Sequence, residues 1–337
     1  MKPRLLVLEL WGLGDLVIAT QFLRAASERF EVTLVAKPFG RDLQPRLWAG
    51  VRVQTLVAPW TAFRGKYRLW LWPWRQLFQM TRELRAQRFD VGVSGRWDPR
   101  DHAWLRLVGA RERIGFPRLG SQRWLTRPLP RPDPEAHRYE YWRGLGRALG
   151  FELPPREALA APPRLSFRTI LVHTGAGQPV RVWPLERYRQ LVQRLRSLGW
   201  RVQVACDPHQ RQWWGEAGET EVVAPQTVAE LLRLIDAADL FIGNDSGPGH
   251  LAACCGVPTF TLFGPQLPEW FAPLHPRARW IEGKPCPFKP CSDYCRWPRP
   301  VCLEHLRFEE VWAAVLEFLQ KTTGSPALTP AEGFCPT

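Results

Sequence analysis

The chain has 337 residues, which is long enough for two packed domains of about 150 residues each, and it carries a formal charge of +14. The excess of Lys and Arg favours an acidic partner, such as nucleic acid, anionic lipid or a phosphorylated small molecule, without choosing among them. The first apolar run contains Glu9 and leads into a Gly-x-Gly turn, which is not typical of a secretory signal, and no apolar run is long enough to span a membrane. We therefore expect a cytoplasmic protein.

The first half of the chain alternates predicted strands with a predicted helix. Apolar runs predict strands at 4–10, 31–36, 51–57 and 90–94. Helical spacing of apolar residues predicts a helix at 15–29. This order is typical of a parallel sheet in an α/β domain. Prolines crowd residues 153–163, and we place the boundary between two domains there.

A second α/β series follows that boundary. The predicted strands are 168–173, 201–206, 240–243 and 259–263, and the predicted helices are 184–198, 228–238 and 249–255. Both halves are thus Rossmann-like. We expect an N-terminal domain at 1–155, a C-terminal domain at 165–307, a helix at 308–321 and a disordered tail at 322–337.

The stretch LELWGLGDLVIAT places Gly12, Gly14 and Asp15 between the first strand and the first helix. It is a poor dinucleotide-binding loop, because the third glycine is missing and Lys37 ends the second strand where an acidic residue is expected. Asp15 lies at the carboxyl edge of the predicted sheet, where open α/β sheets bind ligands. From this turn alone, a helix cap and a catalytic base are equally good interpretations of Asp15.

Two further loops carry polar residues in the second half. The turn HTGAGQPVRVWP combines Gly175, Gly177 and Arg181 before a helix, which suits a diphosphate, although an ordinary loop with a surface arginine has the same pattern. The stretch IGNDSGPGHLAA brings Asp245, Ser246, Gly247, Gly249 and His250 to the end of a strand and the start of a helix. In the alternative interpretation of this stretch, both residues serve the fold only: Asp245 caps the helix and His250 is a buried core histidine.

Together, GLGDLVIAT, HTGAG…RVWPLERY and NDSGPGHLAA resemble the heptosyltransferases of glycosyltransferase family 9, in order and spacing, over about residues 4–320. The resemblance implies a GT-B fold, in which two Rossmann-like domains face a central cleft. The N-terminal domain would hold the acceptor and the C-terminal domain the nucleotide-sugar.

The resemblance also implies the roles of individual residues. Asp15 matches the proposed general base of an inverting transfer. The donor-binding positions it implies are Gly175, Gly177, Arg181, Asp245, Ser246, Gly247, Gly249 and His250. Arg181 stands where the family usually has Lys, and Val182 departs from the family pattern, which puts donor affinity in doubt. No Asp-x-Asp motif is present, so we expect transfer without a metal or other cofactor.

The segment 59–78 mixes cations with aromatic residues. Its counterpart in the family contacts a phosphorylated lipid acceptor, and the acceptor-binding residues we predict are Gly14, Arg64, Lys66 and Arg68. Cations suit phosphate and Trp suits a membrane interface. A solvated basic loop over a small aromatic core is the alternative. Nucleic acid is not an expected partner, because no nucleic-acid-binding module is recognised.

Four cysteines, Cys286, Cys291, Cys295 and Cys302, cluster near the end of the second domain. They could hold a structural metal, although their spacing is not that of common zinc sites, or they could be buried or redox-labile thiols. Both interpretations stay open.

We therefore predict a glycosyltransferase that moves heptose from ADP-heptose to a lipopolysaccharide inner-core acceptor of the lipid A-Kdo type. It would act as a peripheral protein on the cytoplasmic face of the inner membrane. The alternatives are transfer of another sugar from its nucleotide, and a catalytically silent, membrane-associated binding protein with the GT-B fold.

Overall fold

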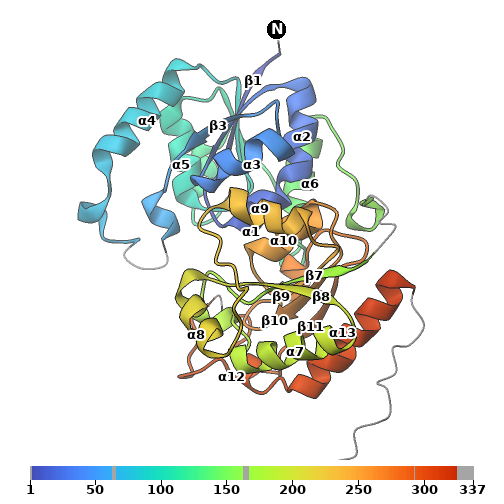
Figure 1. Ribbon diagram of the computed structural model, residues 1–337. Coiled ribbons are helices and arrows are strands. Elements are labelled where there is room, and N and C mark those ends of the chain that lie inside the picture. The colour runs from blue at the N-terminus through green and yellow to red at the C-terminus, as the bar shows by residue number, and fades with distance from the viewer. Residues whose placement is uncertain (1, 63–65, 162–166, 292, 325–337) are drawn as a thin grey trace, which may run out of the picture. The chain divides into compact units, whose positions relative to one another are not determined.

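The computed structural model describes residues 2–62, 66–161, 167–291 and 293–324 (Figure 1). The chain divides into two compact units. Unit 1 comprises Met1–Pro155 with Thr227–Ala229, and unit 2 comprises Arg156–Gln226 with Glu230–Thr337. The division after Pro155 falls within the proline-rich stretch at 153–163.

Unit 1 is built on a parallel sheet of six strands in the order β3-β2-β1-β4-β5-β6. The strands are β1 (Arg4–Glu9), β2 (Glu31–Ala36), β3 (Arg52–Thr55), β4 (Val91–Ser94), β5 (Glu112–Gly115) and β6 (Arg127–Pro128). The central strand β1 is almost continuously apolar, as expected for a parallel strand with both faces covered. Its Leu5 pairs with Val32 on one side and Val91 on the other.

Helices cover both faces of this sheet. They are α1 (Leu13–Ile18), α2 (Thr20–Arg29), α3 (Phe39–Leu47), α4 (Trp74–Ala86), α5 (Pro99–Val108) and α6 (Tyr139–Ala148), with 3-10 turns at Pro59–Thr61, Leu69–Leu71 and Ser121–Trp124. Leu6 and Leu8 of β1 share one core with Trp104 of α5, and α4 packs on α5. Because side chains alternate along a strand, Leu5 and Val7 face the opposite side. Helix α2 packs on α6, and the ring centroids of Phe22 and Trp142 lie 5.0 Å apart.

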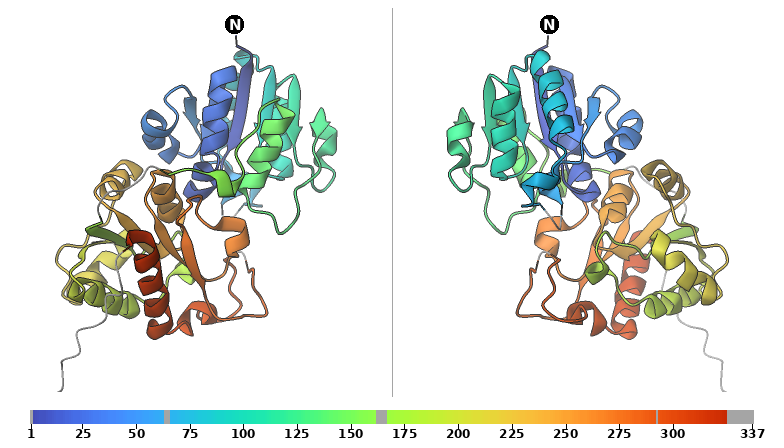
Figure 2. Two further views of the ribbon diagram at one scale, coloured as in Figure 1. Left: turned by 90° about the vertical axis from the view of Figure 1, so that its right-hand side faces the viewer. Right: turned by 90° about the vertical axis from the view of Figure 1, so that its left-hand side faces the viewer.

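Unit 2 has a parallel sheet of five strands in the order β11-β10-β9-β7-β8. The strands are β7 (Thr169–His173), β8 (Arg201–Ala205), β9 (Leu240–Asn244), β10 (Thr259–Phe263) and β11 (Arg279–Glu282). The helices are α7 (Leu185–Ser197), α8 (Arg211–Glu216), α9 (Val228–Asp236, of which the first two residues are grouped with unit 1), α10 (Gly247–Cys254), α11 (Pro268–Phe271), α12 (Val301–Glu304) and α13 (Phe308–Thr323), with 3-10 turns at Arg156–Ala158, Pro179–Arg181 and Pro208–Gln210. Trp183, Trp214 and Phe318 are fully buried in the core (Figure 2 gives further views of the elements).

Most predicted elements are confirmed, and the differences have local causes. The predicted helix 15–29 is two helices, because the amide of Ala19 bonds the carbonyl of Leu16 and tightens the turn between α1 and α2. Helix α10 begins at Gly247 rather than at residue 249, since Pro248 in its first turn favours a helix start.

At the C-terminus, α13 continues to Thr323. The prediction of a disordered tail from residue 322 is therefore wrong for Thr322 and Thr323, because Thr322 lies on the buried face of α13, with Val315, Phe318 and Leu319. The rest of that predicted tail, 325–337, lies outside the described residues. No helix in the described part of the chain has both the length and the apolar character needed to cross a membrane.

Candidate active site

A pocket of about 220 Å³ lies at the carboxyl edge of the unit 1 sheet. Its lining residues are Glu9, Asp15, Ile18, Gly95, Arg96, Arg138 and Trp142. Glu9 is the last residue of β1, and Asp15 and Ile18 lie in α1, the helix that follows it. Gly95 and Arg96 follow β4 directly. Strands β1 and β4 are adjacent in the sheet, and the strands that follow each of them in sequence are added on opposite sides: β2 and β3 beside β1, and β5 and β6 beside β4. Open α/β sheets bind ligands at such a topological switch point. Asp15 therefore lies in the position that the sequence predicted for it.

Both carboxylate oxygens of Asp15 have partners. Oδ2 accepts a hydrogen bond from the amide of Gly12 at 3.1 Å, and Oδ1 lies 3.0 Å from a terminal nitrogen of Arg96. Asp15 thus accepts a hydrogen bond from a backbone amide at the start of α1, as the cap interpretation requires. It does so from the third position of the helix, because the N-cap residue itself is Gly12. Its side chain is 19% exposed, so the same carboxylate also reaches the pocket.

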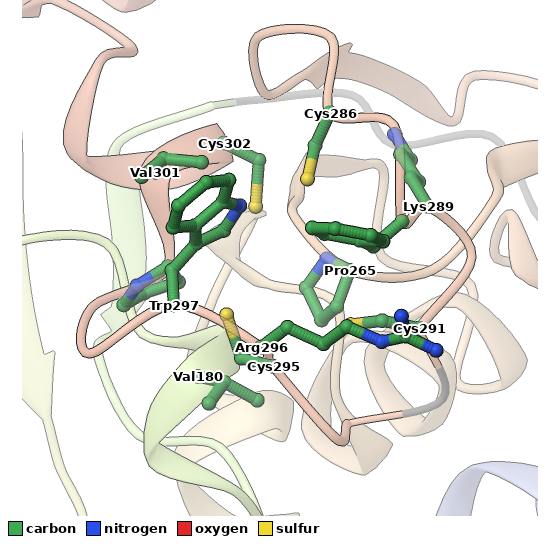
Figure 3. Close-up of a pocket in the computed structure, with 12 residues that line it drawn as sticks. Val180, Pro265, Cys286, Lys289, Cys291, Cys295, Arg296, Trp297, Val301 and Cys302 are labelled. Carbon is green, nitrogen blue, oxygen red and sulfur yellow. The ribbon is translucent and has the colours of Figure 1, made fainter.

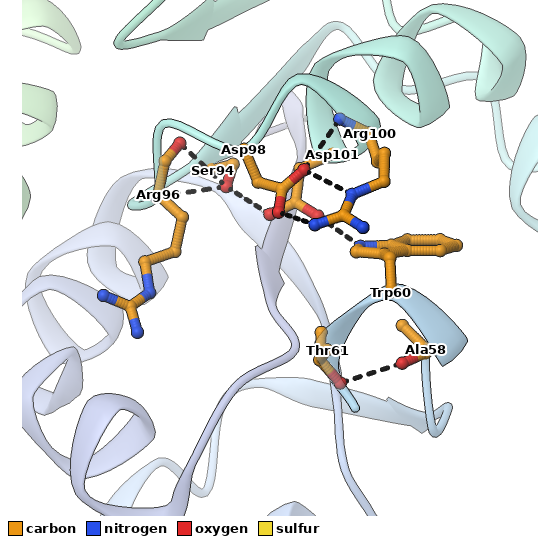
Figure 4. Close-up of polar contacts among 8 residues, drawn as sticks. All are labelled: Ala58, Trp60, Thr61, Ser94, Arg96, Asp98, Arg100 and Asp101. Carbon is orange, nitrogen blue, oxygen red and sulfur yellow. Dashed lines mark hydrogen bonds and ion pairs between the residues drawn. The ribbon is translucent and has the colours of Figure 1, made fainter. Parts of the chain in front are cut away.

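A buried network holds the loop that carries Arg96 (Figure 4). The hydroxyl of Ser94 accepts a hydrogen bond from the Arg96 amide at 3.2 Å and donates to Asp101 at 3.0 Å. The indole of Trp60 donates to the other oxygen of Asp101 at 2.8 Å. Burial raises the pKa of Asp101 to about 7. The Arg96 side chain extends away from this network, and its guanidinium lies over the ring of Trp11 at 4.7 Å.

The second carboxyl of the pocket, Glu9, is 2% exposed. Burial, and then the nearby charge of Asp15, raise the pKa of Glu9 to about 8, so this group is mainly protonated at neutral pH. Burial lowers the pKa of Arg138 to about 10, and the positive charge of Arg96 adds to the effect. Burial also lowers the pKa of Lys37, which is near enough to interact with Asp15 and Glu9.

The switch point of unit 2 lies between β7 and β9. Here Asn244, at the end of β9, connects three segments through one buried amide. Its oxygen accepts from the amide of Trp183 at 3.0 Å and from the hydroxyl of Tyr188 at 2.9 Å, while its nitrogen donates to the carbonyl of Thr174 at 2.9 Å. The two loops of the predicted donor site are thereby held together.

Arg181 is bound by two carboxylates in this site. Its Nε and one terminal nitrogen each lie 2.6 Å from an oxygen of Asp293, and the other terminal nitrogen lies 3.2 Å from Asp245. The side chain of Asp293 is 2% exposed and that of Asp245 is 3% exposed. Arg181 is 23% exposed, so its guanidinium is fixed by buried partners and still reaches the surface of the site.

The predicted donor-binding glycines have different surroundings. A Cβ atom on Gly175 would lie 2.2 Å from the carboxylate of Asp207. This carboxylate is held in place by the hydrogen bond that it accepts from the amide of Ala176, so packing alone favours glycine at position 175. A Cβ on Gly177 would meet nothing within 4 Å, so the space beside this residue is open. Ser246 is the N-cap of α10, and Gly247 and Gly249 are in its first turn. His250, in the same helix, is buried.

Comparison with known proteins decides the family. The sequence profile of glycosyltransferase family 9 (heptosyltransferase) matches residues 77–296. The chain belongs to glycosyltransferase family 9. Lipopolysaccharide heptosyltransferase 1 of Pseudomonas aeruginosa is 31% identical over 217 residues, which are 56% of this chain and 58% of that protein. Lipopolysaccharide heptosyltransferase 3 of Escherichia coli K12 is 30% identical over 110 residues, 28% of this chain and 30% of that protein. These alignments thus span less than two thirds of either relative.

Solved structures match nearly the whole chain. A family 9 glycosyltransferase from Veillonella parvula has a TM-score of 0.73 at 18% identity, with 95% of this chain and 98% of that chain covered. The E. coli heptosyltransferase WaaC with ADP has a TM-score of 0.71 at 18% identity, with 94% and 99% covered. At these identities the likeness shows the fold, and it confirms the predicted GT-B class with two Rossmann-like domains.

In this family 9 chain, none of the predicted acceptor-binding residues that the structure describes is among those that line the Asp15 pocket. Gly14 is within α1, one residue from Asp15, but Lys66 and Arg68 lie on the segment before α4, and Arg64 lies outside the described residues. That segment and the first turns of α4 expose large apolar side chains: Tyr67 (76%), Leu69 (53%), Trp70 (77%) and Leu71 (64%) before the helix, and Trp74 (54%) and Phe78 (72%) in it. Trp60 and Trp72 pack beneath it, with ring centroids 5.6 Å apart.

The cysteine cluster lines a second pocket, of about 330 Å³, in unit 2 (Figure 3). Cys286, Cys291, Cys295 and Cys302 all contribute to its wall. Among the residues that the structure describes, no group of three or more His, Cys, Asp or Glu side chains is arranged to hold a metal ion. Burial raises the pKa of Cys291 and of Cys302, which favours the neutral thiol at pH 7. Cys302 is buried, whereas Cys286, Cys291 and Cys295 are partly buried.

Sequence reasoning missed several residues of both sites: Glu9, Arg96, Arg138, Asn244 and Asp293. Glu9 carried a signal, because a lone carboxylate ends an otherwise apolar strand at the carboxyl edge of the sheet. Asn244 is inside the NDSGPGH motif, but its scaffold role needs the tertiary contacts. Asp293 is 112 residues from Arg181, and no local pattern predicts that pair.

Proposed function

We propose that this family 9 protein is an inverting glycosyltransferase that transfers heptose from ADP-heptose to a lipopolysaccharide inner-core acceptor. The observation that carries the proposal is that each unit has a polar site at its own switch point. Asp15 lies in the unit 1 pocket, and Arg181 with Asp245 lies beside the start of α10 in unit 2. The curated relatives are lipopolysaccharide heptosyltransferases, and one similar solved structure holds ADP.

In the proposed reaction, unit 2 binds the nucleotide-sugar. Arg181 and the amides at the start of α10 stabilise the negative charge that develops on the departing diphosphate. The predicted sugar and phosphate contacts are Gly175, Gly177, Asp245, Ser246, Gly247, Gly249 and His250. The reaction needs no metal in this scheme, because the cation and the helix start supply the charge stabilisation.

Asp15 then acts as the general base. Its carboxylate takes the proton of the acceptor hydroxyl while that oxygen attacks the anomeric carbon, the bond from this carbon to the diphosphate oxygen breaks, and ADP leaves with the electron pair. Attack on the face opposite the leaving group inverts the anomeric configuration. The ion pair with Arg96 and the bond from Gly12 orient the base for this step.

We also propose that the protein is a peripheral protein on the cytoplasmic face of the inner membrane. The exposed aromatic residues from Tyr67 to Phe78, interspersed with Lys66, Arg68 and Arg75, have the composition of an interfacial anchor. An acceptor with a phosphorylated lipid anchor lies at that surface. Binding to anionic vesicles, with loss in a Trp70→Ala/Trp74→Ala variant, tests this part separately.

The test of the reaction offers the purified chain ADP-heptose, or another nucleotide-sugar, together with a lipid A-Kdo acceptor, and follows nucleotide release. We expect ADP release with the heptose donor, in the presence and absence of EDTA. Release with a different donor only would replace heptose with that sugar. No transfer from any donor would favour a binding protein that keeps the fold.

A further inference from the structure

The carboxylate of Asp101 is fully buried, and no cation forms an ion pair with it in the part of the chain that the structure describes. The two arginines that flank it in sequence pair elsewhere: Arg96 with Asp15, and Arg100 with Asp98. A buried carboxylate without a paired cation costs free energy that an apolar side chain would avoid. The start of α5 and two hydrogen bonds offset part of this cost. Asp101 therefore serves the geometry of its surroundings more than the stability of the core.

Asp101 determines the direction of the Ser94 hydroxyl. The Oγ of Ser94 lies 3.0 Å from the Asp101 carboxylate, 3.2 Å from the amide of Arg96 and 3.5 Å from the carbonyl of Arg96 (Figure 4). A hydroxyl has one hydrogen to donate, and an ionised carboxylate only accepts. The hydrogen of Ser94 therefore points to Asp101, and a lone pair of the same oxygen is left to accept the amide of Arg96.

The backbone of Arg96 is also fixed by the residue before it. A Cβ atom on Gly95 would lie 2.5 Å from the ring of Trp142, so the loop after β4 is packed closely against that ring. From this fixed backbone the guanidinium of Arg96 lies 4.7 Å from the ring centre of Trp11 and 3.0 Å from the carboxylate of Asp15. The position of the Arg96 backbone thus decides where its guanidinium meets Asp15.

The second oxygen of Asp101 is held from outside this loop. It accepts a hydrogen bond from the indole of Trp60 at 2.8 Å, and the buried ring of Trp60 packs on that of Trp72, with ring centroids 5.6 Å apart. The carboxylate therefore has one donor on each oxygen. An asparagine at position 101 has the same shape but one accepting oxygen, so it can satisfy either Trp60 or Ser94 and not both.

We propose that Asp101 is a positioning residue for the base. Through Ser94 it fixes the backbone of Arg96, and through the guanidinium of Arg96 it fixes the carboxylate of Asp15. This inference rests on the proposed function, in which Asp15 takes the proton of the acceptor hydroxyl. Asp101 is buried and touches no substrate, so its loss lowers turnover by misplacing Asp15 and leaves donor binding, which belongs to unit 2, unchanged.

The test is a double-mutant cycle with Asp101→Asn, Arg96→Ala and the variant that carries both changes. Asp98→Asn is the matched control, because it makes the same change at the same helix start, where the carboxylate of Asp98 bonds the amide and the guanidinium of Arg100 instead. Nucleotide release gives kcat and the donor KM. Amide hydrogen exchange, followed by NMR, reports the bond from Arg96 to Ser94, and thermal melting verifies folding. Should Asp101→Asn not fold, Ser94→Ala takes its place in the cycle.

We expect Asp101→Asn to lower kcat about 10- to 100-fold with the donor KM unchanged, because the base is misplaced while the donor site is intact. In the Arg96→Ala background the same change should lower kcat less than about 2-fold, since residues that act through one another are not additive. The Arg96 amide should exchange faster in Asp101→Asn than in the wild type. Asp98→Asn should keep the kcat and the exchange rate of the wild type.

Two results would overturn the inference: a folded Asp101→Asn variant with the kcat of the wild type, or an equal loss of kcat with and without Arg96. The second result would mean that Asp101 acts on the fold as a whole. Failure of the proposed function gives a different pattern. In that case no nucleotide-sugar supports transfer by the wild type, while the faster exchange of the Arg96 amide in Asp101→Asn still reports the link from Asp101 to the Arg96 loop.

Discussion

Replacing Glu9 with Gln should stabilise the protein in alkaline solution and have little effect in acid. The pKa of Glu9 rises from 4.5 to about 8 on folding, mainly through burial. Below pH 4.5 this carboxyl is protonated in both the folded and the unfolded chain, and it does not disfavour folding. As the pH rises from 4.5 toward 8, the carboxyl ionises in the unfolded chain but stays protonated in the folded one, so the free energy of unfolding falls. A glutamine at this position is uncharged at every pH, and its side-chain oxygen can still accept a hydrogen bond from the amide of Trp11.

The magnitude follows from the shift. One pKa unit corresponds to about 1.4 kcal/mol, so between pH 5 and pH 8 the wild type should lose about 3 kcal/mol relative to Glu9→Gln. At about 2–4 °C per kcal/mol for a domain of this size, the difference in melting temperature should widen by roughly 6–12 °C. Calorimetric melting of the full chain at several pH values measures it. Glu31→Gln, which removes a half-exposed carboxyl of β2, is the control.

An equal difference in melting temperature between the wild type and Glu9→Gln at pH 5 and at pH 8 would refute this prediction. That result would mean that the folded-state carboxyl ionises as easily as the unfolded one.

Two further predictions concern the Asp15 and Arg181 sites, and a third concerns the cysteine cluster. Asp15→Asn should lower turnover about 10²- to 10⁴-fold with the donor KM unchanged, as measured by ADP release, and near-wild-type turnover would exclude Asp15 as the base. Asp293→Asn should raise the donor KM about 10-fold and leave the acceptor KM unchanged, because Arg181 loses a charged partner. The same donor KM in the wild type and in Asp293→Asn would contradict a role for this ion pair. Iodoacetamide at pH 7 should modify Cys291 and Cys302 slowly in the folded chain and quickly in urea, because burial in the folded chain raises their pKa. Mass spectrometry follows the labelling, and equal rates in the two conditions would contradict protection of these thiols by the fold.

The sequence predicted the fold well where the hydrophobic pattern is strong. The strands at 31–36 and 259–263 match the structure residue for residue, because both are buried almost throughout, and Lys37 follows the first while Pro258 and Gly264 flank the second. The short strands β5, β6 and β11 were not predicted, since they are partly exposed and have no continuous apolar run. Their positions depend on pairing with the neighbouring strands of each sheet.

The candidate sites were predictable only in part. Motif residues such as Asp15 and Arg181 could be singled out because they follow strands at the edge of a sheet. The groups that surround them come from distant segments: Arg138 is the N-cap residue of α6, and Asp293 lies between Cys291 and Cys295. Local spacing contains no information about such partners, and the pKa of Glu9 depends on burial that only the packed structure defines.

The buried amide of Asn244 limits which residues this position can accept. Aspartate would still accept from Trp183 and Tyr188, but it would turn a carboxylate oxygen toward the carbonyl of Thr174. Leucine, similar in size, would leave all three groups without their partner, at a cost of about 1–3 kcal/mol for each buried group. An asparagine that need not touch any substrate can thus be as intolerant of replacement as the residues that do, and a mutational scan of the donor site should be interpreted with that in mind.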